Sequence, residues 1–135
     1  MSDNKETVQR MFDEVINKGN VEVIDELFDP DFQSTAPPNT MDREEFKGFV
    51  QMWRAAFPDV HCEVYDLVAE GDMVAWGVRA TGTQTGDFMG IPPTGRFVDF
   101  DSLNIGEFSG GRAIRHKVIM DVPGLMAQLG VGGPA

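Results

Sequence analysis

The sequence predicts a single α+β domain in which helices pack on one face of a curved, antiparallel sheet. Apolar residues recur at helical spacing in the first half of the chain, whereas the second half alternates apolar and polar residues between glycine-containing turns. The 135 residues suffice for one domain with its own core, and no repeat or linker divides them. We therefore expect residues 1–135 to form one domain.

Two helices are expected first. The apolar residues within 8–16 form one stripe on an otherwise charged segment, and the same pattern resumes over 21–28. The sequence Asp29-Pro30-Asp31 then interrupts the helical pattern. Residues 33–40, which contain two consecutive prolines, are predicted to form a loop.

A third and strongly amphipathic helix is expected over residues 46–57. Asp42 is suited to cap its N-terminus, and Glu44 and Glu45 lie in the first turn, where the helix dipole favours anions. Pro58 and the residue after it end the helix.

Four β-strands are expected in the second half of the chain. They cover residues 60–68, 73–83, 97–108 and 113–120. Turns at 69–72 and 109–111 and a Gly/Pro-rich loop at 86–95 connect them, and a short helix over 125–129 follows. Residues 132–135 are expected to fray.

The charge of the chain argues against two classes of partner. Its 11 basic and 22 acidic residues give a formal net charge of −11, which repels nucleic acids and anionic membrane surfaces. No segment approaches the ~18 apolar residues of a membrane span, and the polar residues 1–7 lack a signal-peptide core, so we expect a cytoplasmic protein. The single cysteine, Cys62, lies among apolar neighbours and is expected to be a buried structural thiol.

Asp121 is a candidate catalytic residue at the end of the last strand. An aspartate in an apolar pocket can take a proton from a carbon next to a carbonyl group. The same residue also suits the N-cap of the C-terminal helix. The sequence leaves both roles open.

Alternation along the last strand groups Arg115, Lys117 and Asp121 on one face. A cation beside Asp121 would stabilise an enolate oxygen, although a solvated strand edge explains the same residues. His116 lies on the other face as a candidate base or a hydrogen-bonded core histidine. Arg79 is a candidate for binding a substrate carbonyl or carboxylate, or for pairing with an acidic residue.

Large apolar side chains are the candidate walls of a pocket for a flat, apolar ligand. They are Trp53, Phe57, Trp76, Phe88, Met89 and Ile91. Ordinary core packing explains the same residues, most readily Trp53 and Phe57. No nucleophilic triad, phosphate-binding loop or dinucleotide motif is present, and two histidines without a third ligand do not predict a metal site, so no cofactor and no metal are expected.

The order of several short motifs resembles the SnoaL-like polyketide cyclase family, which has the cone-shaped fold of nuclear transport factor 2. The matching segments are residues 20–32, Ala56-Phe57-Pro58-Asp59, Ala69-Glu70-Gly71-Asp72, Thr81-Gly82-Thr83, residues 88–95, and Asp121 with Gln128-Leu129-Gly130. The resemblance spans about residues 8–130. It implies an aldol-type ring closure on a polycyclic aromatic polyketide without a cofactor, with Asp121 as the acid/base.

The chain departs from the family pattern at four positions. Thr35 and Gln84 stand where the family often has histidine, Arg115 replaces a glutamate, and Lys117 replaces a tryptophan. These departures favour, as an alternative, a cofactor-independent hydroxylase of an anthracycline-type polyketide. A non-catalytic ligand-binding or assembly module is the other alternative. An open curved sheet also predicts a homodimer or homotetramer.

Overall fold

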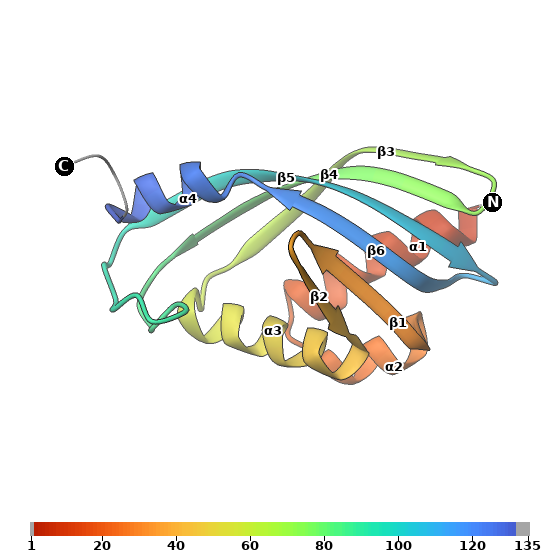
Figure 1. The fold of residues 1–135 in the computed structure, drawn as a ribbon, viewed down its shortest axis with the longest axis horizontal. Coiled ribbons are helices and arrows are strands. Elements are labelled where there is room, and N and C mark those ends of the chain that lie inside the picture. Colours follow the sequence, from red (N-terminus) through yellow and green to blue (C-terminus); the bar gives the residue numbers. More distant parts are fainter. Residues whose placement is uncertain (1, 132–135) are drawn as a thin grey trace.

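The computed structural model describes residues 2–131, so the expected frayed end at 132–135 lies outside it. The helical elements are α1 (Ser2–Arg10), the π-helical η1 (Met11–Ile16), the 3-10 turn η2 (Val21–Val23), α2 (Ile24–Leu27), α3 (Arg43–Ala56) and α4 (Val122–Leu129). The strands are β1 (Phe28–Ala36), β2 (Asn39–Asp42), β3 (His61–Glu70), β4 (Met73–Thr83), β5 (Phe97–Ser109) and β6 (Arg112–Met120). The α+β prediction is confirmed (Figure 1).

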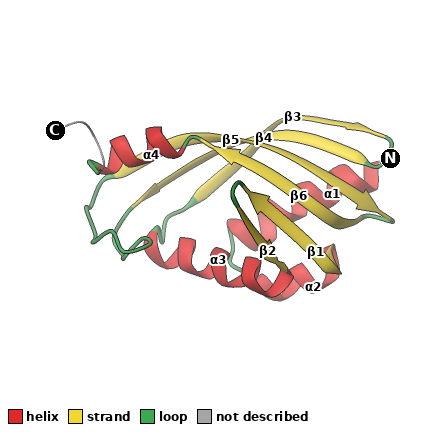
Figure 2. Ribbon diagram, in the orientation of Figure 1, coloured by secondary structure: helices red, strands yellow, loops and turns green. Residues whose placement is uncertain are grey.

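The six strands form one sheet in the order β2-β1-β6-β5-β4-β3. The pairs from β3 to β6 are antiparallel as predicted, but β1 and β6 pair in parallel, so the sheet is mixed. Figure 2 shows α1 and α3 on the same side of this curved sheet and α4 at one end of it. The helices and the sheet therefore enclose the interior of a cone.

The predicted loop at residues 33–40 is wrong, because most of these residues belong to β1 and β2. The Asp29-Pro30-Asp31 sequence ends the helical pattern, yet the chain continues in an extended conformation. The register of β1 against β6 is irregular between Phe28 and Gln33, so Pro30 lies where no regular ladder hydrogen bond is needed.

Helix α3 begins as the sequence predicts. The Asp42 side chain accepts a hydrogen bond of 2.8 Å from the Glu45 backbone N–H, and the Glu45 side chain accepts one from the Asp42 N–H. This capping box satisfies two backbone donors at the helix start. It fixes the beginning of the helix that carries Phe46, Val50 and Trp53 into the core.

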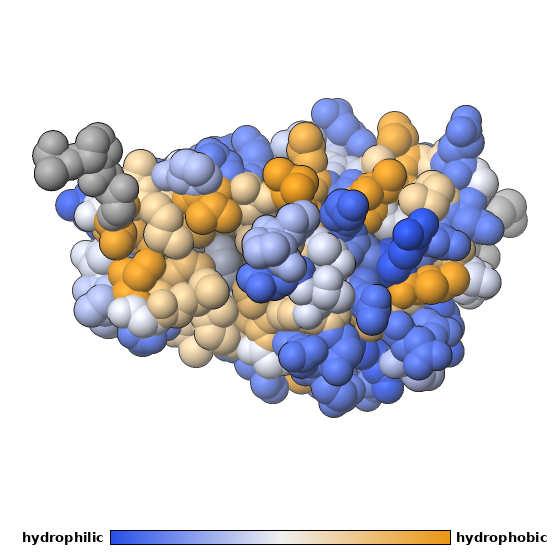
Figure 3. All heavy atoms as spheres, in the orientation of Figure 1, coloured by the Kyte–Doolittle hydropathy of each residue, from blue (hydrophilic) through white to orange (hydrophobic). Residues whose placement is uncertain are grey.

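Strand alternation determines which residues enter the cone. On β5 the buried residues are Val98, Phe100, Asn104, Gly106 and Phe108, and on β6 the central buried residue is His116. The intervening residues of both strands lie on the outer face of the sheet. In the view of Figure 3, apolar side chains gather between α4 and α3, whereas hydrophilic ones cover the region of α2 and β1. Within residues 2–131, no helix combines the length and apolar character needed to cross a bilayer.

Candidate active site

A row of polar side chains crosses the otherwise apolar interior at His116. The Ser34 hydroxyl lies 3.0 Å from His116 Nδ1, and His116 Nε2 lies 2.7 Å from Asn104 Oδ1. Asn104 Nδ2 in turn donates to Ser102 Oγ at 3.2 Å. Ser34 and His116 are direct partners in the β1–β6 pair, so the parallel strand pairing brings the two side chains together.

The hydrogen-bond partners define the tautomer of His116. The Asn104 amide oxygen can only accept, so His116 Nε2 carries the hydrogen. His116 Nδ1 is then unprotonated and accepts from the Ser34 hydroxyl. Ser34, His116, Asn104 and Ser102 are therefore joined in one continuous chain of hydrogen bonds.

His116 is held as the neutral imidazole. Burial lowers the pKa of His116 from 6.5 to about 4, because the charged form would lose its hydration. The Trp76 indole stacks on the imidazole, with ring centroids 5.5 Å apart and planes 11° from parallel. With neutral hydrogen-bond partners around it, His116 stabilises the arrangement of Asn104 rather than supplying a charge.

A cluster of aromatic side chains fills the interior between α3 and the sheet. The Trp53 ring lies 5.2 Å from Phe57, 5.0 Å from Phe88 and 5.7 Å from Phe100, measured between centroids. Trp53, Phe57 and Phe88 were predicted as pocket walls, and the structure brings them together. All three are buried, as core packing also requires.

Gln84 holds the loop that delivers Phe88 to this cluster. Its side-chain nitrogen donates to the Ile91 carbonyl at 3.0 Å, and its side-chain oxygen accepts from the Thr94 hydroxyl at 2.7 Å. Sequence reasoning noted Gln84 only as a departure from a family histidine. Its full burial within a Gly/Pro-rich loop identifies it as the residue that orders residues 85–95.

Asp121 lies at the rim of the cone, directly before α4. Its side chain is exposed, and Oδ1 accepts a hydrogen bond of 3.0 Å from the Gly124 backbone N–H. The capping role left open by the sequence is therefore present. Asp121 also follows Met120, which pairs with Ser102 at the outer end of the polar row.

The two cations predicted beside Asp121 lie on the outer face of the sheet. The inward residues of β6 are His116, Val118 and Met120, so Arg115 and Lys117 are exposed. Arg115 pairs with Glu107 at 2.6 Å. The prediction that Arg115 and Lys117 face a pocket is therefore wrong.

Arg79, Met89 and Ile91 also lie away from the polar row. Arg79 makes two hydrogen bonds to the Asp99 carboxylate, at 2.9 and 2.5 Å, which matches the pairing alternative. Met89 is 70% exposed at the tip of the loop, where its positive φ forms the turn between Phe88 and Ile91. Met89 is thus not a wall of the interior, whereas the half-buried Ile91 packs against the core.

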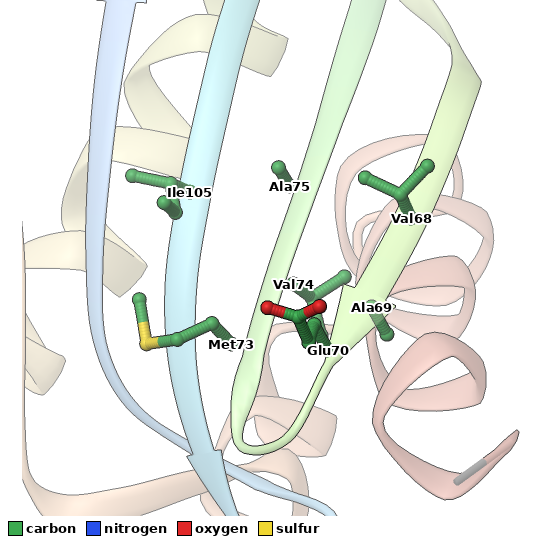
Figure 4. A pocket seen from close by; sticks show the side chains of 7 residues that line it. All are labelled: Val68, Ala69, Glu70, Met73, Val74, Ala75 and Ile105. Carbon is green, nitrogen blue, oxygen red and sulfur yellow. The ribbon is translucent and has the colours of Figure 1, made fainter.

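Two open hollows lie on the outer face of β3, β4 and β5. The first, of about 360 Å³, lies near the β3–β4 turn, with Val68, Ala75 and Ile105 on the three strands (Figure 4). The second, of about 230 Å³, includes Tyr65, Gly77 and Leu103. Both hollows are open, and the second is lined in part by Trp76 and Asn104 as well as by outward-facing residues.

Sequence reasoning missed Ser34, Ser102 and Asn104. A signal for two of them exists, because Ser102 and Asn104 interrupt the apolar alternation of Val98, Phe100 and Phe108. Polar residues on an apolar strand face call for partners. Ser34 carries no such signal, since its segment was predicted to be a loop.

The open mixed sheet with helices on one side defines a cone-shaped α+β domain of the class of nuclear transport factor 2. The sequence profile of the SnoaL-like polyketide cyclases matches residues 6–129. The chain therefore belongs to the SnoaL-like polyketide cyclase family.

Solved structures agree with this assignment. A proposed SnoaL-like polyketide cyclase from Jannaschia sp. CCS1 is 29% identical, with 98% of this chain and 94% of that chain covered and a TM-score of 0.88. IdmH, a proposed polyketide cyclase from Streptomyces antibioticus, is 36% identical (95% and 99% covered, TM-score 0.84). AclR, a proposed hydroxylase from Streptomyces galilaeus, is 26% identical (100% and 86% covered, TM-score 0.87). No curated protein matches the chain.

Proposed function

We propose that this protein catalyses a cofactor-independent ring closure of the aldol type on a polycyclic aromatic polyketide. The observation that carries the proposal is the row of hydrogen-bond donors in an apolar interior, together with the rim residue Asp121, which directly follows the strand partner of Ser102. Donors that face a developing oxyanion stabilise it most strongly where water is excluded. Membership of the polyketide cyclase family supports the same reaction class.

In this proposal Asp121 takes a proton from the carbon between two carbonyl groups of the substrate. Ser102 and Asn104 donate hydrogen bonds to the resulting enolate oxygen, and the carbanion attacks the carbon of a third, more distant carbonyl group of the substrate to form the new C–C bond. The oxygen of that carbonyl group takes the proton back from Asp121, so no oxidant or cofactor is consumed. His116 is a positioning residue that holds the Asn104 amide, and Arg115 and Lys117 take no part.

The position of Asp121 supports this role. Only Oδ1 is used in the helix cap, and among residues 2–131 Oδ2 has no hydrogen-bond partner. The cap fixes the carboxylate without neutralising it. The aromatic cluster of Trp53, Phe88 and Phe100 supplies apolar surface for fused rings.

The test is incubation of the purified protein with an aromatic polyketide precursor under air and under argon. We expect ring-closed product under both gases and a loss of about 100-fold or more in Asp121→Asn. Asp13→Asn is the matched control, because it removes the same charge from an exposed position on η1, away from Asp121. Equal loss in both variants would contradict the assigned role of Asp121.

The alternative is a cofactor-independent hydroxylase acting on an anthracycline-type polyketide, which the similarity to AclR favours. In that case the carbanion adds to dioxygen to give a hydroperoxide, and a two-electron reductant must be supplied to convert this to the hydroxyl group and water, so oxygenated product forms only under air and oxygen is consumed. Binding of several precursors without conversion, unchanged in Asp121→Asn, would instead identify a non-catalytic ligand-binding module.

We propose further that two copies of the chain pair through the outer face of the sheet. Val68, Leu103 and Ile119 are 59%, 65% and 57% exposed there, which is unusual for three large apolar side chains on one face. The buried, unpaired thiol of Cys62, whose pKa burial raises to about 12, fits a reducing compartment, and the cytoplasm is the location we propose.

A further inference from the structure

The indole N–H of Trp76 has no hydrogen-bond partner among the described residues, although the side chain is only 3% exposed. Two arginine nitrogens, Arg43 Nε and Arg112 Nε, share this condition. In both arginines, however, another nitrogen of the same guanidinium donates to the Phe28 carbonyl. Trp76 is thus a buried side chain whose entire hydrogen-bonding capacity is unmet.

An unpaired buried donor of this kind calls for a partner. Leaving an N–H group in an apolar interior costs free energy, and natural proteins nearly always satisfy such groups. Trp76 lies directly opposite Asn104 in the β4–β5 pair and stacks on His116. Its donor therefore belongs to the same interior region as the polar row.

Three donor hydrogens in this region have no acceptor among the described residues. His116 Nδ1 is occupied by the Ser34 hydroxyl, and Asn104 Oδ1 is occupied by His116 Nε2. One hydrogen of Asn104 Nδ2 goes to Ser102, which leaves the second N–H, the Ser102 hydroxyl hydrogen and the Trp76 indole N–H to be satisfied. The groups of the row are all neutral, so they complement a neutral acceptor such as a ketone or quinone oxygen better than a carboxylate.

We propose that Trp76 is a specificity-determining residue whose indole N–H donates to a carbonyl oxygen of the bound ligand, away from the carbon that reacts at Asp121. The proposal rests on the proposed function for the ligand class, a fused aromatic polyketide. The new element is that the end of the ligand near Trp76, away from Asp121, carries a carbonyl group. A ligand without that oxygen leaves the donor unpaired and binds less well.

The test compares two probes of the same shape, 9-fluorenone with a carbonyl group and fluorene with a methylene group in its place. Equilibrium dialysis of the wild-type protein should show about fivefold to tenfold tighter binding of fluorenone. Trp76→Phe, which removes the N–H and keeps an aromatic ring, should abolish this preference by reducing the ratio of the two affinities to about one. Trp53→Phe is the matched control, since Trp53 belongs to the aromatic cluster, and it should retain the preference.

A second measurement observes the ligand contact in the wild-type protein itself. The chain has two tryptophans, so the ¹⁵N-labelled wild-type protein gives two indole signals, which Trp53→Phe assigns. Fluorenone should shift the Trp76 signal and fluorene should not. The proposal is overturned by an unmoved Trp76 signal, by equal binding of both probes, by failure of fluorenone to bind, or by a preference that survives Trp76→Phe, which would assign recognition of the carbonyl group to another donor.

These outcomes are independent of turnover. Loss of ring closure with intact fluorenone preference would refute the proposed reaction and leave the role of Trp76 standing. Ring closure without any preference for fluorenone would refute the role of Trp76 and leave the proposed reaction standing.

Discussion

The backbone N–H of Gly124 donates a 3.0 Å hydrogen bond to Asp121 Oδ1, and a Cβ atom at position 124 would occupy the space of the same carboxylate. The absence of a side chain at Gly124 therefore sets the position of Asp121. Because the carboxylate is the proposed proton acceptor, the first turn of α4 and the chemistry at the rim are linked.

Gly124→Ala should therefore lower turnover about tenfold or more by rotating the Asp121 carboxylate away from its position. Alanine has the better helix propensity, by up to about 1 kcal/mol, which offsets the lost cap and leaves the free energy of unfolding nearly unchanged. Steady-state kinetics measures the turnover, and urea unfolding measures the free energy of unfolding. Gly48→Ala on α3, where a Cβ meets open space, is the control and should stabilise the protein without changing turnover. Unaltered kinetics in Gly124→Ala would show that Gly124 does not set the catalytic position of the Asp121 carboxylate.

His116 should make the protein less stable in mild acid. Its pKa is about 4 in the folded protein and 6.5 when unfolded, so the unfolded state binds the proton first. The contribution of neutral His116 to the free energy of unfolding is fully present above pH 6.5. It is lost as the pH falls toward 4, by roughly 3 kcal/mol in total. Urea unfolding between pH 7 and pH 5, where carboxylates still titrate little, should show this slope in wild type.

His116→Gln should flatten that slope, because glutamine keeps a donor for Asn104 but does not titrate. His61→Gln, at an exposed histidine, should leave the slope as in wild type. A slope that persists in His116→Gln would assign the acid sensitivity to other groups.

Gln84→Leu should destabilise the protein by roughly 2–4 kcal/mol, because it leaves buried partners of the loop unpaired. The affected groups include the Ile91 carbonyl and the Thr94 hydroxyl. Urea unfolding measures the loss, with Gln51→Leu on the exposed side of α3 as the control. A loss below about 0.5 kcal/mol would show that the loop holds its shape without Gln84.

Leu103→Lys should convert a homodimer into monomers, because it places a charge in the centre of the exposed apolar face. Light scattering coupled to size-exclusion chromatography measures the mass. Met89→Lys changes an equally exposed side chain at the loop tip and should leave the dimer intact. A monomeric wild-type protein, or a dimeric Leu103→Lys, would rule out pairing through this face.

Local patterns predicted most of the fold. Helix α3 and strand β4 begin and end close to the expected residues because capping, periodicity and glycine turns are properties of short segments. Strand β1 escaped prediction because Pro30 indicates a break, and only the distant β6 shows that the chain stays extended through it.

The candidate site was less accessible from the sequence. Alternation correctly grouped Arg115 with Lys117 but did not say which face of β6 turns inward. That choice depends on the helices packed against the sheet. The partners of His116 come from two other strands, so their identity follows from register rather than from spacing along the chain.

The parallel pairing of β1 with β6 also has a consequence for how the chain folds. It joins residues 33–35 to residues 115–117, so the middle of the sheet closes only after nearly the whole chain is available. Contacts between such distant segments carry a large loop-closure entropy and slow folding. During synthesis on the ribosome, β1 can pair with β6 only after residue 112 has been made, and a chain shortened before that residue would leave β1 paired with β2 alone.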